Sequence, residues 1–326
     1  MSKEEIQIAQ AHQALQQIRL MVSKVLIGQQ DMIEALLIGI LTRGHILLEG
    51  APGLAKTLAI RTLSKVLDLP FQRVQFTPDL LPSDLVGTEI YSPKTGEFST
   101  RQGPIFTNIL LADEINRAPP KVQSALLEAM AERQVTIGSD TFQLPNPFLV
   151  LATQNPLEQE GTYPLPEAQA DRFMLKVIVD YPTVEEERKI LMGSSKRDTV
   201  LSTLSPIISQ EGLLQLQQIV EQIHIEEMLC DYIIQIVRAT RDARSFGIPV
   251  SRYIQFGASP RASLSMQSAA KARALLQSRN FVTPDDIKYV AHSILRHRIL
   301  LTYEAEAENI STNFIIDNIL QHIRTP

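Results

Sequence analysis

The stretch that decides the fold runs from His45 to Leu58 and reads His-Ile-Leu-Leu-Glu-Gly-Ala-Pro-Gly-Leu-Ala-Lys-Thr-Leu. Its first five residues form an apolar run of strand length, and a helical segment follows from Lys56 to Leu67, so the residues between them form a loop from a strand into a helix. Such a loop can bind phosphate because the free N–H groups of a helix N-terminus point at the anion. We predict that Lys56 reaches the β- and γ-phosphates of a nucleotide and that the Thr57 hydroxyl ligates Mg²⁺.

One position departs from the usual phosphate loop, which has glycine immediately before the lysine. This chain has Ala55 there. Alanine adds only a methyl group and favours helix, so the sequence permits a close approach of phosphate without guaranteeing it. The alternative is a Gly- and Pro-containing turn before a surface helix.

Further apolar runs indicate a parallel sheet around this loop. Strands are predicted at 71–76, 109–112, 148–153 and 174–179, and they alternate with helices at about 29–42 and 56–67. This alternation is typical of an α/β fold whose sheet is covered on both faces. We predict an N-terminal helix at 1–25, an α/β core at 26–182 and, after Tyr181-Pro182-Thr183, a smaller all-α lid at 183–326. No strand is predicted in the lid, and its helices are expected at about 184–194, 209–221, 226–243, 260–278 and 284–296.

Two of the predicted strands end in polar side chains. The run 109–112 leads into Asp113-Glu114, and the run 149–153 leads into Gln154-Asn155. We expect the first to lie adjacent to the strand of the phosphate loop, presenting Asp113 to the hydration shell of Mg²⁺ while Glu114 polarises an attacking water. Asn155 would hold that water or the γ-phosphate, the alternative being a simple turn before Pro156.

Two hairpins are predicted between the strands. The segment 82–104 contains the turn Pro93-Lys94-Thr95-Gly96 between Ile90-Tyr91 and Phe98, and residues 134–144 form a second hairpin around Gly138-Ser139. They could transmit hydrolysis as movement towards a ring pore or a partner. The alternative is an inert surface ribbon.

Composition excludes several classes of protein. The chain has 326 residues, 31 basic and 36 acidic side chains and a net charge of −5, which argues against a surface devoted to nucleic acid. The single cysteine, Cys230, cannot form an internal disulfide, so we expect a reducing, cytoplasmic compartment. No membrane span and no signal peptide are predicted. The six histidines lack metal-site spacing, and Arg296-His297-Arg298 is interpreted as a solvated helix face.

The motifs together resemble those of the MoxR family of AAA+ ATPases over about residues 20 to 300. The matching segments are 49–57, Asp113-Glu-Ile-Asn-Arg-Ala-Pro119, Ala152-Thr-Gln-Asn-Pro156, Pro166-Glu-Ala-Gln-Ala-Asp-Arg-Phe173 and Gly257-Ala-Ser-Pro-Arg-Ala262. Alanine before the lysine is that family's own form. The insert at 82–104 resembles the helix-2 insert of the clade that also contains the magnesium chelatase ATPase subunit.

The resemblance implies roles for further residues. Asn155 would be the sensor 1 residue, and Arg261, in the first turn of a helix capped by Ser259, would be sensor 2. Arg172 would be an arginine finger inserted into the ATP site of a neighbouring subunit, with Arg117 as the competing candidate. For Arg172 the alternative is a salt bridge with Asp171 or Glu167, and for Arg261 a solvated arginine.

The predicted site therefore has three parts. The catalytic residues are Lys56, Glu114, Asn155, Arg172 and Arg261, and the metal ligands are Thr57 and Asp113. The nucleotide-binding residues are Ile27, Gly28, Gly50, Ala51, Pro52, Gly53, Leu54, Ala55, Lys56, Thr57 and Leu58, with ATP and Mg²⁺ as cofactors.

By resemblance, the expected function is ATP hydrolysis by a homo-oligomeric ring, expected to be a hexamer. Hydrolysis would drive chaperone-like remodelling or maturation of a partner, including metal insertion, and family members are associated with von Willebrand factor A domain proteins. The alternatives are an ATPase subunit of a metal chelatase, a DNA-linked motor, and a nucleotide switch that does not hydrolyse ATP. Intact Glu114, Asn155, Arg172 and Arg261 argue against the switch.

Overall fold

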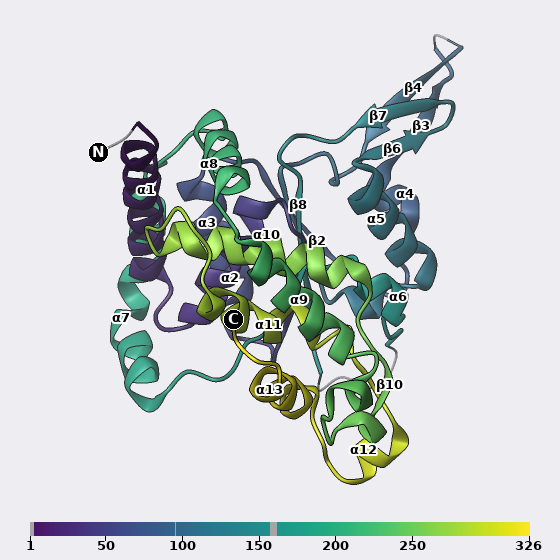
Figure 1. Ribbon diagram of the computed structural model, residues 1–326. Coiled ribbons are helices and arrows are strands. Elements are labelled where there is room, and N and C mark those ends of the chain that lie inside the picture. Colours follow the sequence, from purple (N-terminus) through teal and green to yellow (C-terminus); the bar gives the residue numbers. More distant parts are fainter. Residues whose placement is uncertain (1–2, 95, 157–161) are drawn as a thin grey trace. The chain divides into compact units, whose positions relative to one another are not determined.

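The computed structural model describes residues 3–94, 96–156 and 162–326 (Figure 1). Its contacts divide the chain into two compact units. The core unit comprises Gln17–Arg172 and Val177–Leu214, and the helical unit comprises Met1–Gln16, Phe173–Lys176 and Gln215–Pro326. The predicted division at residue 182 stays a prediction, and Thr95 of the first hairpin turn lies outside the described residues.

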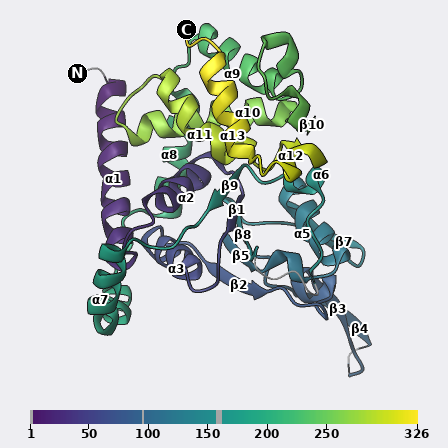
Figure 2. The same ribbon diagram turned by 90° about the horizontal axis from the view of Figure 1, so that it is seen from below.

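The chain has a five-stranded sheet in the order β2-β5-β8-β1-β9 (Figure 2), and all of it except the first two residues of β9 belongs to the core unit. The strands are β1 (Ile46–Glu49), β2 (Phe71–Gln75), β5 (Ile109–Asp113), β8 (Leu149–Gln154) and β9 (Leu175–Ile178). The pairs β2/β5, β5/β8 and β8/β1 are parallel. The α/β fold with a parallel sheet is therefore confirmed.

One expectation about the sheet is wrong, because β5 does not lie adjacent to β1. β8 lies between them and pairs with both, Ala112 opposite Ala152 and Leu47 opposite the same residue. The acidic strand is consequently two positions from the strand of the phosphate loop. All three strands run in one direction, so their carboxyl ends still meet at a single edge of the sheet.

The helices of the core bury apolar residues in the expected pattern. In α2 (Gln30–Thr42) every residue from Met32 to Leu41 is buried, which explains why this run carries no charged residue except Glu34. α3 (Lys56–Val66) buries Ala59, Ile60 and Leu63. The remaining helices that lie wholly or partly in this unit are α1 (Lys3–Val25), α4 (Pro82–Val86), α5 (Pro120–Glu132), α6 (Glu167–Ala170), α7 (Val184–Thr203) and α8 (Gln210–Gln222).

Both predicted hairpins are confirmed. β3 (Gly87–Ser92) pairs with β4 (Glu97–Gln102), and β6 (Gln134–Ile137) pairs with β7 (Asp140–Gln143). The two hairpins lie side by side next to α5 (Figures 1 and 2). At the β6–β7 turn a Cβ on Gly138 would come within 2.2 Å of the Glu89 carboxylate, so the turn packs directly against β3.

The helical unit departs from the sequence prediction in two places. A short antiparallel pair, β10 (Ile254–Phe256) with β11 (Leu300–Leu301), occurs where no strand was expected. Strands of three and two residues are too short to produce a periodic pattern in the sequence. The second departure concerns helices, because α12 and α13 were not predicted. The α-helices of the helical unit are α9 (Glu227–Ala239), α10 (Pro260–Leu276), α11 (Pro284–Leu295), α12 (Tyr303–Ala307) and α13 (Thr312–His322).

The interpretation of Arg296-His297-Arg298 as a solvated face is also wrong. Arg298 is buried, with 8% of its surface exposed, and the Nδ1 atom of His297 is buried. The three residues follow the end of α11 and turn into the unit, so their charges do not form a surface stripe. Among the described residues, no helix is both long and apolar enough to cross a membrane.

Candidate functional site

The phosphate loop joins β1 to α3 and adopts a conformation that only small residues allow. A Cβ on Gly50 would lie 2.5 Å from the Val179 carbonyl oxygen, so any side chain there would displace backbone. Gly53 has φ +86° and no other atom within 4 Å of a Cβ position, which leaves its backbone open to a ligand. Ala55 has φ 58°, a left-handed conformation that costs an alanine about 1 kcal/mol. The alanine form of the loop therefore keeps the backbone turn that a glycine would adopt without strain.

Lys56 points back across this loop. Its Nζ donates to the Gly50 oxygen at 2.5 Å and to the Ala51 oxygen at 3.3 Å, so the ammonium group lies inside the curve of the loop. Burial lowers the pKa of Lys56, and the carboxylates of Asp113, Glu114 and Glu49 oppose that shift. The lysine is thus a partly desolvated cation held near three acids.

A cleft of about 370 Å³ joins the loop to the ends of the neighbouring strands. It brings together Lys56, Thr57, Asp113, Glu114 and Asn155, which come from three separate predicted motifs. The other residues that line it are Pro52, Gly53, Leu54, Ala55, Leu58, Arg73, Thr153 and Gln154.

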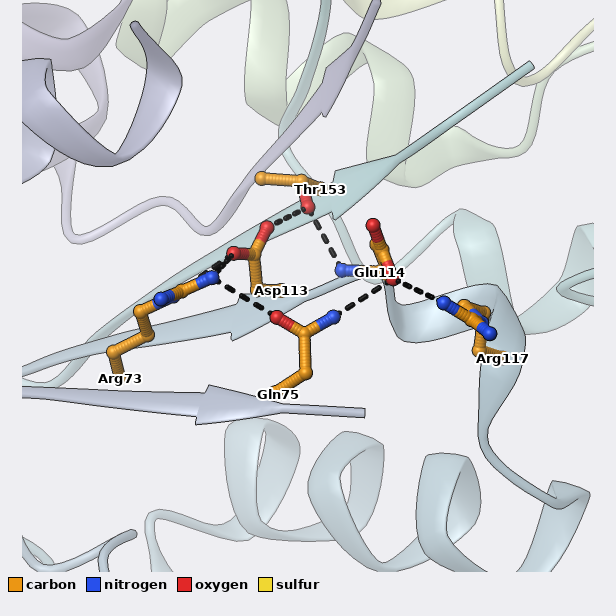
Figure 3. A network of polar contacts seen from close by, with 6 residues as sticks. All are labelled: Arg73, Gln75, Asp113, Glu114, Arg117 and Thr153. Atoms are coloured by element: carbon orange, nitrogen blue, oxygen red, sulfur yellow. Dashed lines mark hydrogen bonds and ion pairs between the residues drawn. The ribbon is translucent and has the colours of Figure 1, made fainter. Parts of the chain in front are cut away.

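Asp113 is held on both of its carboxylate oxygens (Figure 3). Oδ2 accepts hydrogen bonds from Arg73, from Nε at 2.9 Å and from Nη2 at 2.6 Å. Oδ1 accepts from the Thr153 hydroxyl at 2.6 Å. The same hydroxyl oxygen accepts the backbone N–H of Glu114 at 2.8 Å, so Thr153 on β8 fixes both acids of β5.

Glu114 is restrained by two side chains of its own chain. Its Oε2 accepts from Gln75 Nε2 at 2.7 Å and from Arg117 Nη1 at 3.0 Å (Figure 3). Gln75 lies opposite Asp113 in the β2–β5 register, and its Oε1 accepts from Arg73 at 3.0 Å. The glutamate also has φ 56°, which for a residue with a side chain is a strained backbone conformation at this site.

A second, smaller pocket of about 70 Å³ adjoins the loop on the side of α7 and is mostly apolar. It contains the predicted residues Ile27, Gly53, Leu54, Ala55 and Leu58, and also Val25, Leu26, Gln29, Pro182 and Ile190. Gly28 has φ +73°, and a Cβ there would lie 2.4 Å from the Glu186 carboxylate. An apolar pocket beside a phosphate loop suits the flat face of a nucleotide base.

The three arginines have different surroundings. Arg117 is bound to Glu114 of its own chain, with 42% of its side chain exposed. Arg172 is exposed in the turn that follows α6. Arg261 is exposed in the first turn of α10, where its N–H donates to the Ser259 hydroxyl at 3.2 Å. The roles of Arg172 and Arg261 stay predictions.

Sequence reasoning missed Arg73 and Gln75. They occupy alternate positions of β2, so both side chains lie on one face of the sheet, and they contact the acids only because β2 pairs with β5. The strand reads Phe-Gln-Arg-Val-Gln, so its polar residues are not confined to alternate positions and no local signal singles these two out.

The residues present fit a magnesium nucleotide. The loop backbone is open at Gly53, the Lys56 ammonium points into the loop, and the Thr57 hydroxyl and Asp113 carboxylate line the same cleft. Hydroxyl and carboxylate oxygens are ligands that Mg²⁺ prefers.

Comparison with known proteins agrees with this geometry. Residues 45–175 match the model of the family "ATPase family associated with various cellular activities (AAA)", and residues 249–319 match the AAA lid domain. Chaperone MoxR1 of Mycobacterium tuberculosis is 49% identical over 94% of this chain and 80% of its own length. Protein MoxR of Paracoccus denitrificans is 33% identical over 87% of this chain and 88% of its own.

A solved structure extends the similarity to the whole fold. The crystal structure of a candidate ATPase from Cytophaga hutchinsonii has 51% sequence identity and a TM-score of 0.93, covering 99% of this chain and 98% of that chain. The chain therefore belongs to the MoxR family of AAA ATPases.

Proposed function

We propose that this protein hydrolyses ATP as one subunit of an oligomeric ring, expected to be a hexamer, and couples hydrolysis to chaperone-like remodelling of a partner protein. The observation that carries the proposal is the cleft in which Lys56, Thr57, Asp113, Glu114 and Asn155 meet. A cation, a hydroxyl and two acids around an open phosphate loop are the parts that phosphoryl transfer needs.

Each residue has a defined task in this proposal. The loop N–H groups and Lys56 bind the phosphates, while Thr57 and Asp113 hold Mg²⁺, which supplies charge neutralisation on the phosphate oxygens when bound. Glu114 accepts a proton from, or orients, the attacking water, and Asn155 keeps that water in line.

Glu114 is restrained before any nucleotide binds. Its Oε2 accepts hydrogen bonds from Gln75 and Arg117, and these two bonds limit how far the carboxylate can move towards an attacking water. We infer that the carboxylate leaves at least one of these partners when the nucleotide is bound. An arginine at the phosphates from a neighbouring subunit, for which Arg172 is the candidate, would complete the site and make turnover depend on assembly.

The proposal that the protein binds a partner rests on the two hairpins and on an exposed aromatic pair. The paired hairpins β3–β4 and β6–β7 are the candidate elements that contact a client. On the first of them the exposed ring of Phe98 packs against Tyr91 at 5.2 Å between centroids, with the ring planes tilted by 51°. By family resemblance we propose a von Willebrand factor A domain protein as partner, metal insertion as one form of maturation, and the cytoplasm as the location. An ATPase subunit of a metal chelatase is the alternative, and a DNA-linked motor the next.

The first test separates binding from hydrolysis. Lys56→Ala should abolish ATP binding in an equilibrium titration, whereas Glu114→Gln should bind ATP and stop turnover. Arg61→Ala, on the exposed face of α3 outside the cleft lining, is the control and should retain both. Unchanged nucleotide affinity in Lys56→Ala would refute the assignment of the loop.

The second test addresses assembly and client. Wild-type turnover per subunit should rise with protein concentration, and mixing Arg172→Ala with Glu114→Gln subunits should recover activity that neither has alone. Constant turnover per subunit across the assembly transition would refute a role for Arg172 in trans. ATP-loaded Glu114→Gln can then serve as bait for partners identified by mass spectrometry.

A further inference from the structure

The four residues that follow Arg172 belong to the helical unit. Phe173 is fully buried and Met174 is 7% exposed, whereas Arg172 itself is exposed. An exposed arginine is thus attached directly to a buried segment of chain. The contacts that hold this segment therefore set the position of the Arg172 backbone, from which the side chain extends.

Arg298 binds the main chain of this segment. Its Nη2 donates to the Phe173 oxygen at 2.8 Å and its Nη1 to the Met174 oxygen at 3.1 Å. Nη1 also donates to the Ile294 oxygen at 2.5 Å, in the last turn of α11. One planar guanidinium therefore joins the C-terminal turn of α11 to two successive carbonyls after Arg172.

His297 holds the same carbonyl from a second direction. Its Nε2 lies 2.9 Å from the Phe173 oxygen, and because a carbonyl oxygen can only accept, Nε2 carries the proton. Burial, followed by the charge of Arg298, lowers the pKa of His297 well below its usual value, so the ring is neutral. The Phe173 oxygen thus accepts two hydrogen bonds, while the ring of Phe173 is buried.

A residue held in this way restricts the one before it. The planar peptide unit between Arg172 and Phe173 leaves their Cα atoms about 3.8 Å apart, with only the two flanking dihedral angles free. Fixing the carbonyl and the ring of Phe173 therefore limits the directions in which the Arg172 side chain can leave the backbone.

We propose that His297 and Arg298 are positioning residues that act on ATP hydrolysis through Arg172. This inference rests on the proposed role of Arg172 as the trans-acting arginine. The helical unit would then contribute to the chemistry of a neighbouring subunit's site by fixing the base of that arginine, in addition to any contribution from Arg261.

The test is a double-mutant comparison with separate readouts for binding and turnover. Arg298→Gln removes the forked cation and should leave ATP affinity within about twofold while lowering turnover about 10²-fold, the loss expected when a catalytic group is misplaced by about 1 Å. Arg298→Lys keeps the charge without the fork and should recover part of that turnover. Arg296→Gln is the matched control, since the Arg296 Nε donates to the His292 oxygen one turn back in α11, and it should retain wild-type turnover.

The decisive result is non-additivity. The double variant Arg172→Ala/Arg298→Gln should turn over no more slowly than Arg172→Ala, because Arg298 has no effect once the residue it positions is absent. Arg298→Gln subunits mixed with Glu114→Gln subunits should also recover activity, as Arg172→Ala subunits do.

Additive losses in the double variant, or ATP affinity lost in parallel with turnover, would overturn the inference. Full turnover in Arg172→Ala would instead show that the proposed role of Arg172 is wrong, which is a different outcome. If Arg298→Gln does not fold, the same cycle is run with Arg298→Lys and with His297→Phe, which removes the second donor to Phe173. Losses that stay additive with Arg172→Ala in those variants also overturn it.

Discussion

His45 gives the strand of the phosphate loop a defined pH sensitivity. It lies directly before β1, is 8% exposed, and uses both ring nitrogens: Nδ1 accepts the Val150 N–H at 2.9 Å and Nε2 lies 3.4 Å from the Met130 oxygen. Burial, with a smaller contribution from the charge of Arg133, lowers its pKa from 6.5 to about 4 despite the opposing bond to Met130. Protonation of His45 would put a hydrogen on Nδ1, which could then no longer accept the Val150 N–H.

The sign and size of the effect follow from this difference in pKa. His45 binds a proton near pH 6.5 in the unfolded chain and near pH 4 in the folded chain. The contribution of neutral His45 to the free energy of unfolding is therefore fully present above pH 6.5 and is lost as the pH falls towards 4. Linkage gives a loss of about 2 kcal/mol at pH 5, and about 3 kcal/mol when the folded group is itself half-titrated.

The assay is urea unfolding followed by circular dichroism at pH 7.5 and pH 5.0, for the wild type and His45→Gln. Glutamine cannot titrate, and the groups common to both chains, His297 included, cancel in the comparison. The wild type should lose about 2 kcal/mol more than the variant between the two pH values. Equal losses in the two chains would refute the reasoning.

Two further predictions concern the loop and the acids. Gly28→Ala should lower the free energy of unfolding, measured by urea unfolding, by about 1–2 kcal/mol, because alanine is strained at φ +73° and its Cβ meets Glu186. Gly193→Ala is the matched control, since it lies inside α7 with only Ile27 near its Cβ, at 3.9 Å. It should raise the free energy of unfolding by up to about 1 kcal/mol. Thr153→Val should lower the free energy of unfolding by about 1–3 kcal/mol, since it leaves the Glu114 N–H without its acceptor. Because Thr153 also binds Asp113, the variant should need a higher Mg²⁺ concentration for nucleotide binding. Thr141→Val, at an exposed position of β7, is the comparison and should change neither measurement.

The sequence predicted what local pattern determines. The phosphate loop, the five strands of the sheet and both hairpins follow from short apolar runs and turn residues, and the structure has them within one or two residues. The strand of Asp113 and the strand of Asn155 were also recognised by their polar ends.

What the sequence could not supply is the order of strands in space. Nothing local says that β8 lies between β1 and β5 or that β2 pairs with β5. The role of Thr153 depends on the first arrangement, and the roles of Arg73 and Gln75 depend on the second. The buried Arg298 was misread for the same reason, because its partners are more than 120 positions away in the chain. β10 and β11 escaped because strands of two or three residues have no periodicity.

The places of the two hairpins in the chain have a consequence for how such proteins can diversify. β3–β4 is inserted between β2 and β5, and β6–β7 between β5 and β8. Each interrupts a crossover, and neither interrupts a strand, so its length and tip sequence can change while the register of the sheet and the spacing of its acids remain the same. On the proposal that these ribbons contact the client, exchanging them between relatives should transfer partner preference and leave the nucleotide chemistry intact.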